Sequence, residues 1–71
     1  MPVVKVIELV GTSAVSWEDA AKNAVSEAAK TVRHITGVDV IGQTAVVQNE
    51  AITEFRANVK IAFMVGEGEV S

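Results

Sequence analysis

The chain contains no cysteine, so it can form neither a disulfide nor a thiolate metal site. Aromatic residues are scarce at 4%, and proline occurs once. The 71 residues suffice for a single domain, residues 1–71. A domain of this size buries only about 60% of the surface that its unfolded chain exposes. Because small domains without disulfides or metals are commonly stabilised by assembly, and 49% of the residues are hydrophobic, we expect an oligomer.

Basic residues are also few, and they are scattered along the chain. Six Lys and Arg stand against nine Asp and Glu, which gives a formal net charge of −3. A nucleic-acid-binding surface needs a basic stripe, so we expect no nucleic-acid partner. No apolar run approaches the ~18 residues of a membrane-spanning helix, and the N-terminus lacks the features of a signal peptide. The sequence therefore predicts a soluble, cytoplasmic protein with no membrane partner.

A long alternation of apolar residues near the C-terminus is the clearest structural signal. Every second residue from Phe55 to Val65 is apolar, which indicates a β-strand with one buried face. The opposite face of this strand is polar at Arg56 and Asn58 but apolar at Ala62 and Met64. So short a chain has nothing to cover that apolar end, which we expect to contact other subunits.

The preceding sequence predicts a strand, a helix and a second strand. Val3–Val10 is rich in Val and Ile and indicates a strand, followed by a turn over 11–13. A helix is expected from Ser16, its N-cap, to a C-terminal cap at Gly37, with a largely alanine stripe on its buried face. Val38 to about Gln48 predicts the second strand, with a bulge near residues 41–42.

The resulting order is β-α-β-β, which gives an α+β fold with a three-stranded sheet wrapping one helix. Residues 48–51 predict the hairpin that leads into the third strand. The right-handed crossover rule makes the first two strands parallel, so the third lies antiparallel between them. Lys30, Arg33 and His34 would occupy the last helical turns, where the helix dipole favours cations. We expect residues 66–71 to fray.

Four segments together resemble the dodecins, small flavin-binding proteins that form hollow twelve-subunit shells. They are Lys5–Ser13 (KVIELVGTS), Thr31–Arg33, Val38–Val40 and Phe55–Phe63. The resemblance covers residues 3 to 65 without large gaps. It implies a hollow homododecamer that binds and stores a small ligand and is not an enzyme. The implied family ligand is a flavin, FMN or riboflavin.

The flavin-site positions that the resemblance implies are Gly37, Val38 and Arg56. Dodecins place a stacking Trp where this chain has Gly37, and Gly has no π-face. They place a Gln that hydrogen-bonds the flavin where this chain has Arg56, which has donors but no acceptor. We therefore expect flavin binding in the stacked mode to be lost or much weakened.

A branch of dodecin-like proteins lacks the stacking Trp and is associated with cations. Residues 16–18 (Ser-Trp-Glu) and the missing Trp resemble that branch. The alternative function is therefore a shell that binds a divalent cation such as calcium, or a purely structural shell. No metal ligands can be assigned, and carboxylates of Asp39, Glu50 or Glu54 would have to be gathered by symmetry, because calcium takes six or more oxygens.

Three single residues have two interpretations each. Trp17 is either an anchor for helix packing, which we favour, or a displaced flavin platform. His34 is either a helix-capping cation, which we favour, or a metal ligand or pH switch. Arg56 either pairs with Glu54 or Asp39 of a neighbouring subunit, which we favour, or clamps an anion such as a phosphate or a carboxylate.

Overall fold

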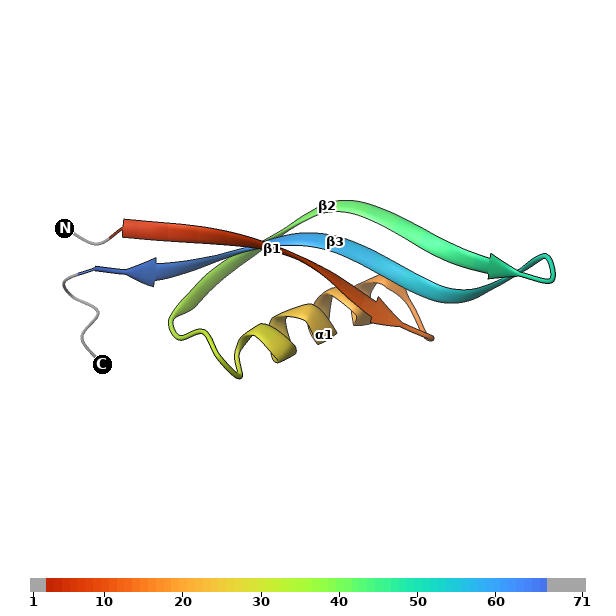
Figure 1. Cartoon of the computed structure of the whole chain (residues 1–71), viewed down its shortest axis with the longest axis horizontal. Helices are drawn as coiled ribbons and strands as arrows, with labels where there is room; N and C mark the ends of the chain where they lie inside the picture. Colours follow the sequence, from red (N-terminus) through yellow and green to blue (C-terminus); the bar gives the residue numbers. More distant parts are fainter. Residues whose placement is uncertain (1–2, 67–71) are drawn as a thin grey trace.

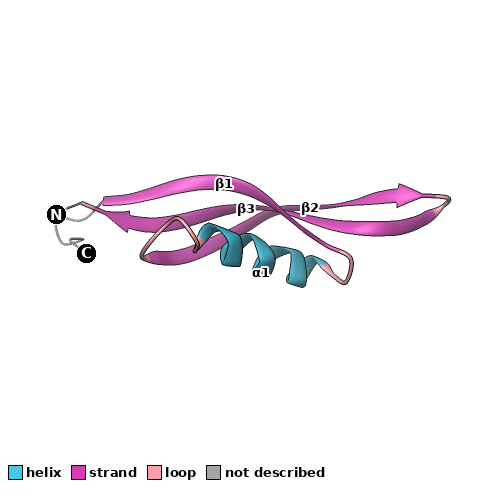
Figure 2. Ribbon diagram, turned by 60° about the horizontal axis from the view of Figure 1, so that its bottom comes forward, coloured by secondary structure: helices cyan, strands magenta, loops and turns pink. Residues whose placement is uncertain are grey.

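The computed structural model describes residues 3–66, which form four elements in the predicted order. These are β1 (Val3–Ser13), α1 (Trp17–Ala28), β2 (Ile35–Gln48) and β3 (Ala51–Val65). The strands form one sheet in the order β1-β3-β2, and β3 pairs antiparallel with both neighbours. The α+β fold and the central position of the third strand are thus confirmed. Figures 1 and 2 show α1 lying against one face of the sheet.

The core is a thin seam of small side chains between α1 and β3. The buried residues of α1 recur every four positions, which places them on one face of the helix. On β3, alternate residues point at that face, as the period of two predicts. The buried set is Ala20, Ala24, Ala28, Ala57, Val59 and Ile61.

Gly11 on β1 sets how closely the helix approaches the sheet. A Cβ at Gly11 would overlap the backbone carbonyl oxygen of Ala20 and lie 2.9 Å from the Cβ of Ala24. Only a residue without a side chain leaves room for the helix backbone here. The turn predicted over residues 11–13 is wrong: β1 continues to Ser13, because Gly11 and Ser13 pair with Ala57 and Phe55 of β3.

Helix α1 begins as predicted but ends earlier. Ser16 is the N-cap, and its Oγ accepts a hydrogen bond from the backbone N–H of Asp19 at 3.0 Å. The helix ends at Ala28, and His34 has a left-handed φ of 61°. The predicted cap at Gly37 is wrong, because Gly37 lies in β2 opposite Ala62.

The basic residues predicted for the last helical turns consequently lie elsewhere. Lys30, Arg33 and His34 follow the helix in the connection to β2. The connection turns the chain so that Ile35 pairs with Phe63 of β3 and packs against the core. Burial of Ile35 in the sheet therefore overrides the helical periodicity that its position suggested.

The hairpin between β2 and β3 matches the prediction. Gln48 pairs with Ala51, and the two residues between them, Asn49 and Glu50, both have positive φ (52° and 65°). Positive φ at both central positions is the type I′ geometry that suits the twist of a hairpin. The predicted bulge is also confirmed, because the register of β2 shifts between Val40 and Gly42. The predicted fraying concerns residues 66–71, and residues 67–71 lie outside the described part.

The Gly11 contact gives a stability prediction. Gly11→Ala should lower the free energy of unfolding by about 1–3 kcal/mol, the usual range for overpacking, because the added methyl group pushes α1 off the sheet. Gly37→Ala is the matched control, since a Cβ at Gly37 meets no atom within 4 Å. Urea unfolding of the three proteins at equal concentration measures the difference. Equal midpoints for all three would contradict the close approach at Gly11.

Candidate functional site

The sheet face opposite α1, here called the outer face, carries Gly37 and Arg56, two of the three predicted flavin-site positions, whereas the third, Val38, pairs with Ile61 on the helix-side face. Ala57, Val59 and Ile61 of β3 face the helix, so the residues between them face outward. The register adds their partners on β1 and β2 to the same face. At one end this face is apolar, with Val4, Val6, Ala62 and Met64. Val6 is 52% exposed although it is a large hydrophobic residue.

Gly37 lies at this apolar end, in a cleft of about 310 Å³. The lining residues are Val6, Gly37, Val38, Asp39, Lys60 and Ala62. The space above Gly37 is open, since a Cβ there would meet nothing within 4 Å. The cleft thus offers apolar walls and a Lys–Asp row, but no aromatic ring for a flat ligand to stack on.

Arg56 lies on the outer face away from this cleft. Its Nε donates a hydrogen bond to Glu54 Oε2 at 2.8 Å, and Thr12 and Thr44 flank it in register. Arg56 lies six positions before Ala62, the partner of Gly37, which amounts to about 20 Å along the strand. One chain therefore does not bring Gly37 and Arg56 to the same small ligand.

Arg56 forms an ion pair within the chain, with Glu54 two residues away on the strand. The favoured contact of Arg56 with a carboxylate of a neighbouring subunit stays a prediction. Both side chains are partly exposed, so the pair contributes at most about 1 kcal/mol. The pair uses one N–H donor of the guanidinium, so the other N–H donors are left for other partners.

Trp17 packs at the junction of three elements. Its Nε1 donates a hydrogen bond to the carbonyl oxygen of Thr44 on β2 at 2.8 Å. Its ring meets Phe55 of β3 edge-on, with ring centroids 4.8 Å apart and planes at 80°. Trp17 is half-buried and lies outside the alanine core, so it joins α1 to the hairpin. This geometry agrees with the packing interpretation.

The candidate metal ligands do not converge within one chain. Among residues 3–66, no three His, Asp or Glu side chains are grouped as a metal site. Asp39 lines the Gly37 cleft, Glu50 lies in the hairpin turn and Glu54 pairs with Arg56. His34 is not in the helix, and its carbonyl oxygen accepts a hydrogen bond from the N–H of Met64 at 3.1 Å.

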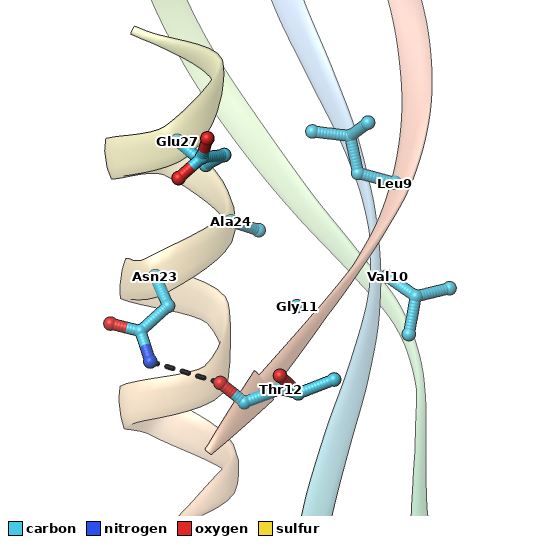
Figure 3. A pocket seen from close by; sticks show the side chains of 7 residues that line it. All are labelled: Leu9, Val10, Gly11, Thr12, Asn23, Ala24 and Glu27. Atoms are coloured by element: carbon cyan, nitrogen blue, oxygen red, sulfur yellow. Dashed lines mark hydrogen bonds between the residues drawn. The ribbon is translucent and has the colours of Figure 1, made fainter. Parts of the chain in front are cut away.

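A second cleft lies between β1 and α1, as Figure 3 shows. Asn23 crosses it, and its Nδ2 donates a hydrogen bond to the Thr12 carbonyl oxygen at 2.9 Å. This bond satisfies one acceptor on the free edge of β1 and ties the helix to that edge. Glu27, also in the lining, pairs with Lys30 at 3.1 Å. We interpret this cleft as a consequence of how α1 packs against β1.

Two residues that line the Gly37 cleft were not predicted from the sequence. Lys60 of β3 lies between Glu8 of β1 and Asp39 of β2 in register, which forms a charged row across the outer face. Val6 supplies the apolar wall. Their grouping depends on the strand register, and the sequence gives that register only once the bulge in β2 is placed. In the described part of the chain, no helix has the length and apolar character to cross a membrane.

Comparisons with known proteins agree with this architecture. Residues 3–66 match the family model described as Dodecin. Calcium dodecin of Mycobacterium tuberculosis is 38% identical over 63 residues, which are 89% of each protein. A crystal structure of that calcium dodecin, described as having a novel calcium-binding site, has a TM-score of 0.80 at 33% identity and covers 97% of this chain and 99% of its own. A mutant of Thermus thermophilus dodecin has a TM-score of 0.89 at 30% identity, over 94% of this chain and 100% of its own.

Proposed function

This chain belongs to the dodecin family, and we propose that it is the non-enzymatic subunit of a hollow homododecamer that holds a small ligand where subunits meet. The observation that carries the proposal is the apolar end of the outer face. Val4, Val6, Ala62 and Met64 lie together there, beside the Gly37 cleft. A second copy that covers these residues would also close the cleft. The cytoplasm is the proposed location, in keeping with a chain that has no cysteine.

Assembly would also compensate for the low folding stability that we expect of a single subunit. The buried core consists of four alanines, one valine and one isoleucine, so little apolar surface is removed from water. Large hydrophobic residues such as Val4, Val10 and Ile41 stay exposed instead. Contacts between copies would bury part of this surface and supply stability that the subunit lacks.

The ligand site is altered relative to a stacked flavin site. Gly37 offers no ring, and the residue where dodecins have a hydrogen-bonding Gln is Arg56, paired with Glu54. Because Gly37 and Arg56 lie about 20 Å apart along β3, a ligand touching both would need them from different subunits. We therefore propose that flavins bind weakly here, and that Gly37, Val38 and Arg56 line the seam without holding a flavin.

A divalent cation is the second candidate ligand. The support is the 38% identity to a protein named calcium dodecin, together with the absence of a stacking residue at Gly37. Symmetry-related carboxylates would complete the six to eight oxygens that calcium takes. Asp39, Glu50 and Glu54 are the carboxylates of the sheet and hairpin that copies would bring together.

Assembly is tested first by size. Sedimentation in dilute, ordinary buffer should show a multi-subunit particle, because the exposed apolar surface favours association. A compact, folded species of 7.5 kDa would overturn the proposed shell. The same samples, measured by circular dichroism, establish that the chain is folded.

Riboflavin titration tests the altered ligand site. We expect the fluorescence of added riboflavin to stay almost unquenched at low micromolar riboflavin, because no aromatic ring is available at Gly37. Gly37→Trp combined with Arg56→Gln should raise riboflavin affinity roughly tenfold, about 1.4 kcal/mol, by restoring a stacking ring and a donor–acceptor side chain.

The matched control for this double variant is Gly37→Leu with Arg56→Gln, which adds apolar bulk without a π-face. If the unmodified protein quenched the fluorescence of riboflavin, another side chain would have to stack on the flavin. A Trp/Gln variant that assembles but binds riboflavin no better than the Leu/Gln control would show that Gly37 and Arg56 do not belong to the flavin seam.

Metal dependence tests the second candidate. A bound calcium ion should raise Tm when calcium chloride is added, and EDTA should reverse the rise, because a ligand at 100 times its Kd stabilises by about 2.7 kcal/mol per site. Magnesium chloride at equal ionic strength is the control. An unchanged Tm, with no calcium found by elemental analysis of the purified protein, would rule out this candidate.

A further inference from the structure

Helix α1 leaves part of the helix-side face of the sheet uncovered. Val38 and Val40 of β2 pair with Ile61 and Val59, which are fully buried under the helix. Val38 and Val40 are nevertheless each 45% exposed. Between α1 and β2 lies an apolar groove of about 360 Å³. Its lining residues are Glu18, Ala21, Lys22, Val25, Ser26 and Val38.

The β2–β3 hairpin projects from the rest of the subunit. Pairing between β1 and β3 ends at Ser13 and Phe55, so residues 46–54, here called the arm, lie beyond the end of β1. Figure 1 shows the arm extending past both β1 and α1, and the longest extent of the molecule is 51 Å. A two-stranded ribbon is marginally stable by itself in water.

The arm carries a pair of exposed apolar side chains. Val47 and Ile52 are cross-strand partners, and they are 61% and 49% exposed. Side chains directly opposite on antiparallel strands lie about 5 Å apart, so the two form one apolar knob. The arm and the groove are thus two unpartnered apolar surfaces, one projecting and one recessed.

We propose that the arm of one subunit lies in the α1–β2 groove of a second copy, an inference that rests on the proposed homo-oligomeric function. Size supports this occupant. A stable interface removes roughly 800 Å² from each partner, about a sixth of the 4856 Å² exposed by one chain. The groove alone is too small, so its occupant must also extend along α1. The arm, which extends past both β1 and α1, projects far enough to do both.

Charge supports the same pairing. The ionisable residues of the arm are Glu50 and Glu54, both acidic. The groove presents Lys22, whose Nζ lies 3.7 Å from Glu18 Oε2 in an exposed pair that contributes little. Glu50 at the tip of the arm can therefore meet Lys22 of the second copy while Val47 and Ile52 cover Val25 and Val38.

The contact has a consequence for symmetry. Arm and groove are different surfaces, so the interface is heterologous, and each subunit donates its arm to one neighbour and receives an arm from another. Such contacts form a closed ring or continue as a filament. A closed shell requires the ring.

Cysteine cross-linking tests the contact directly, because the chain has no cysteine of its own. Trp17 at the start of α1 bonds to Thr44 at the base of the arm, and α1 runs away from the arm, so Val25 lies a further 12 Å or so along the helix. A disulfide needs Cα atoms within about 7 Å. Any disulfide between positions 25 and 47 is therefore intermolecular.

We expect Val25→Cys with Val47→Cys to give a ladder of covalent oligomers on non-reducing gels after mild oxidation. The matched control is Val15→Cys with Val47→Cys, since Val15 is 74% exposed and lies outside both the arm and the groove. Each single-cysteine variant is a further control, and none of the controls should form the ladder. An assembled 25/47 variant without cross-links, or equal cross-linking of the 15/47 control, would overturn the arm–groove contact.

A second variant keeps the test decisive if the double-cysteine protein does not fold. Val47→Asp should raise the concentration at which half of the assembly dissociates by at least tenfold, whereas Val15→Asp should leave it unchanged, because Val15 is 74% exposed and lies outside arm and groove. Equal effects of the two substitutions would contradict the inference. If the unmodified protein is monomeric, the proposed shell fails; if it assembles and these tests fail, the arm–groove contact alone is wrong.

Discussion

The close approach of α1 to β1 at Gly11 is the constraint on which the rest of the subunit depends. It forces small residues on both sides, so alanines of the helix meet Ala57 and Val59 of the sheet. Such a seam brings the helix close to the sheet, but it removes little apolar surface from water. The subunit consequently gains its helix–sheet geometry from small side chains and leaves its larger hydrophobic residues on the surface.

The strand register then arranges that surface. Because β3 lies between β1 and β2, its outward residues each acquire a neighbour on both sides, which forms rows across the sheet. One row is apolar beside Gly37, one is charged around Lys60, and one is polar around Arg56. Gly37 and Arg56, the two positions expected from the family resemblance to contact a flavin, fall in different rows. In the proposed assembly, a ligand that touches both would therefore need two subunits.

The sequence predicted the parts of the structure that local patterns encode. The alternation along residues 55–65 identified the central strand, and Ser16 and the 48–51 segment marked the helix start and the hairpin. The end of the helix was missed, because residues 29–37 carry helix-like periodicity that the burial of Ile35 in the sheet overrides. The pair that Arg56 forms with Glu54 inside the chain was not predicted, although Glu54 lies two residues away on the same strand face. Positions 37 and 56 came from family resemblance, and Lys60 lines the cleft with Gly37 only through the strand register.

The bulge in β2 has a consequence for how this strand tolerates change. It shifts the register between Val40 and Gly42, so the residues before and after it keep their own faces without a common alternation. A strand with such an irregularity can absorb the gain or loss of one residue locally, without exchanging its buried and exposed sides elsewhere. Length differences among homologous chains should therefore collect at this point, where the ladder is already interrupted, and leave the seam beneath the helix intact.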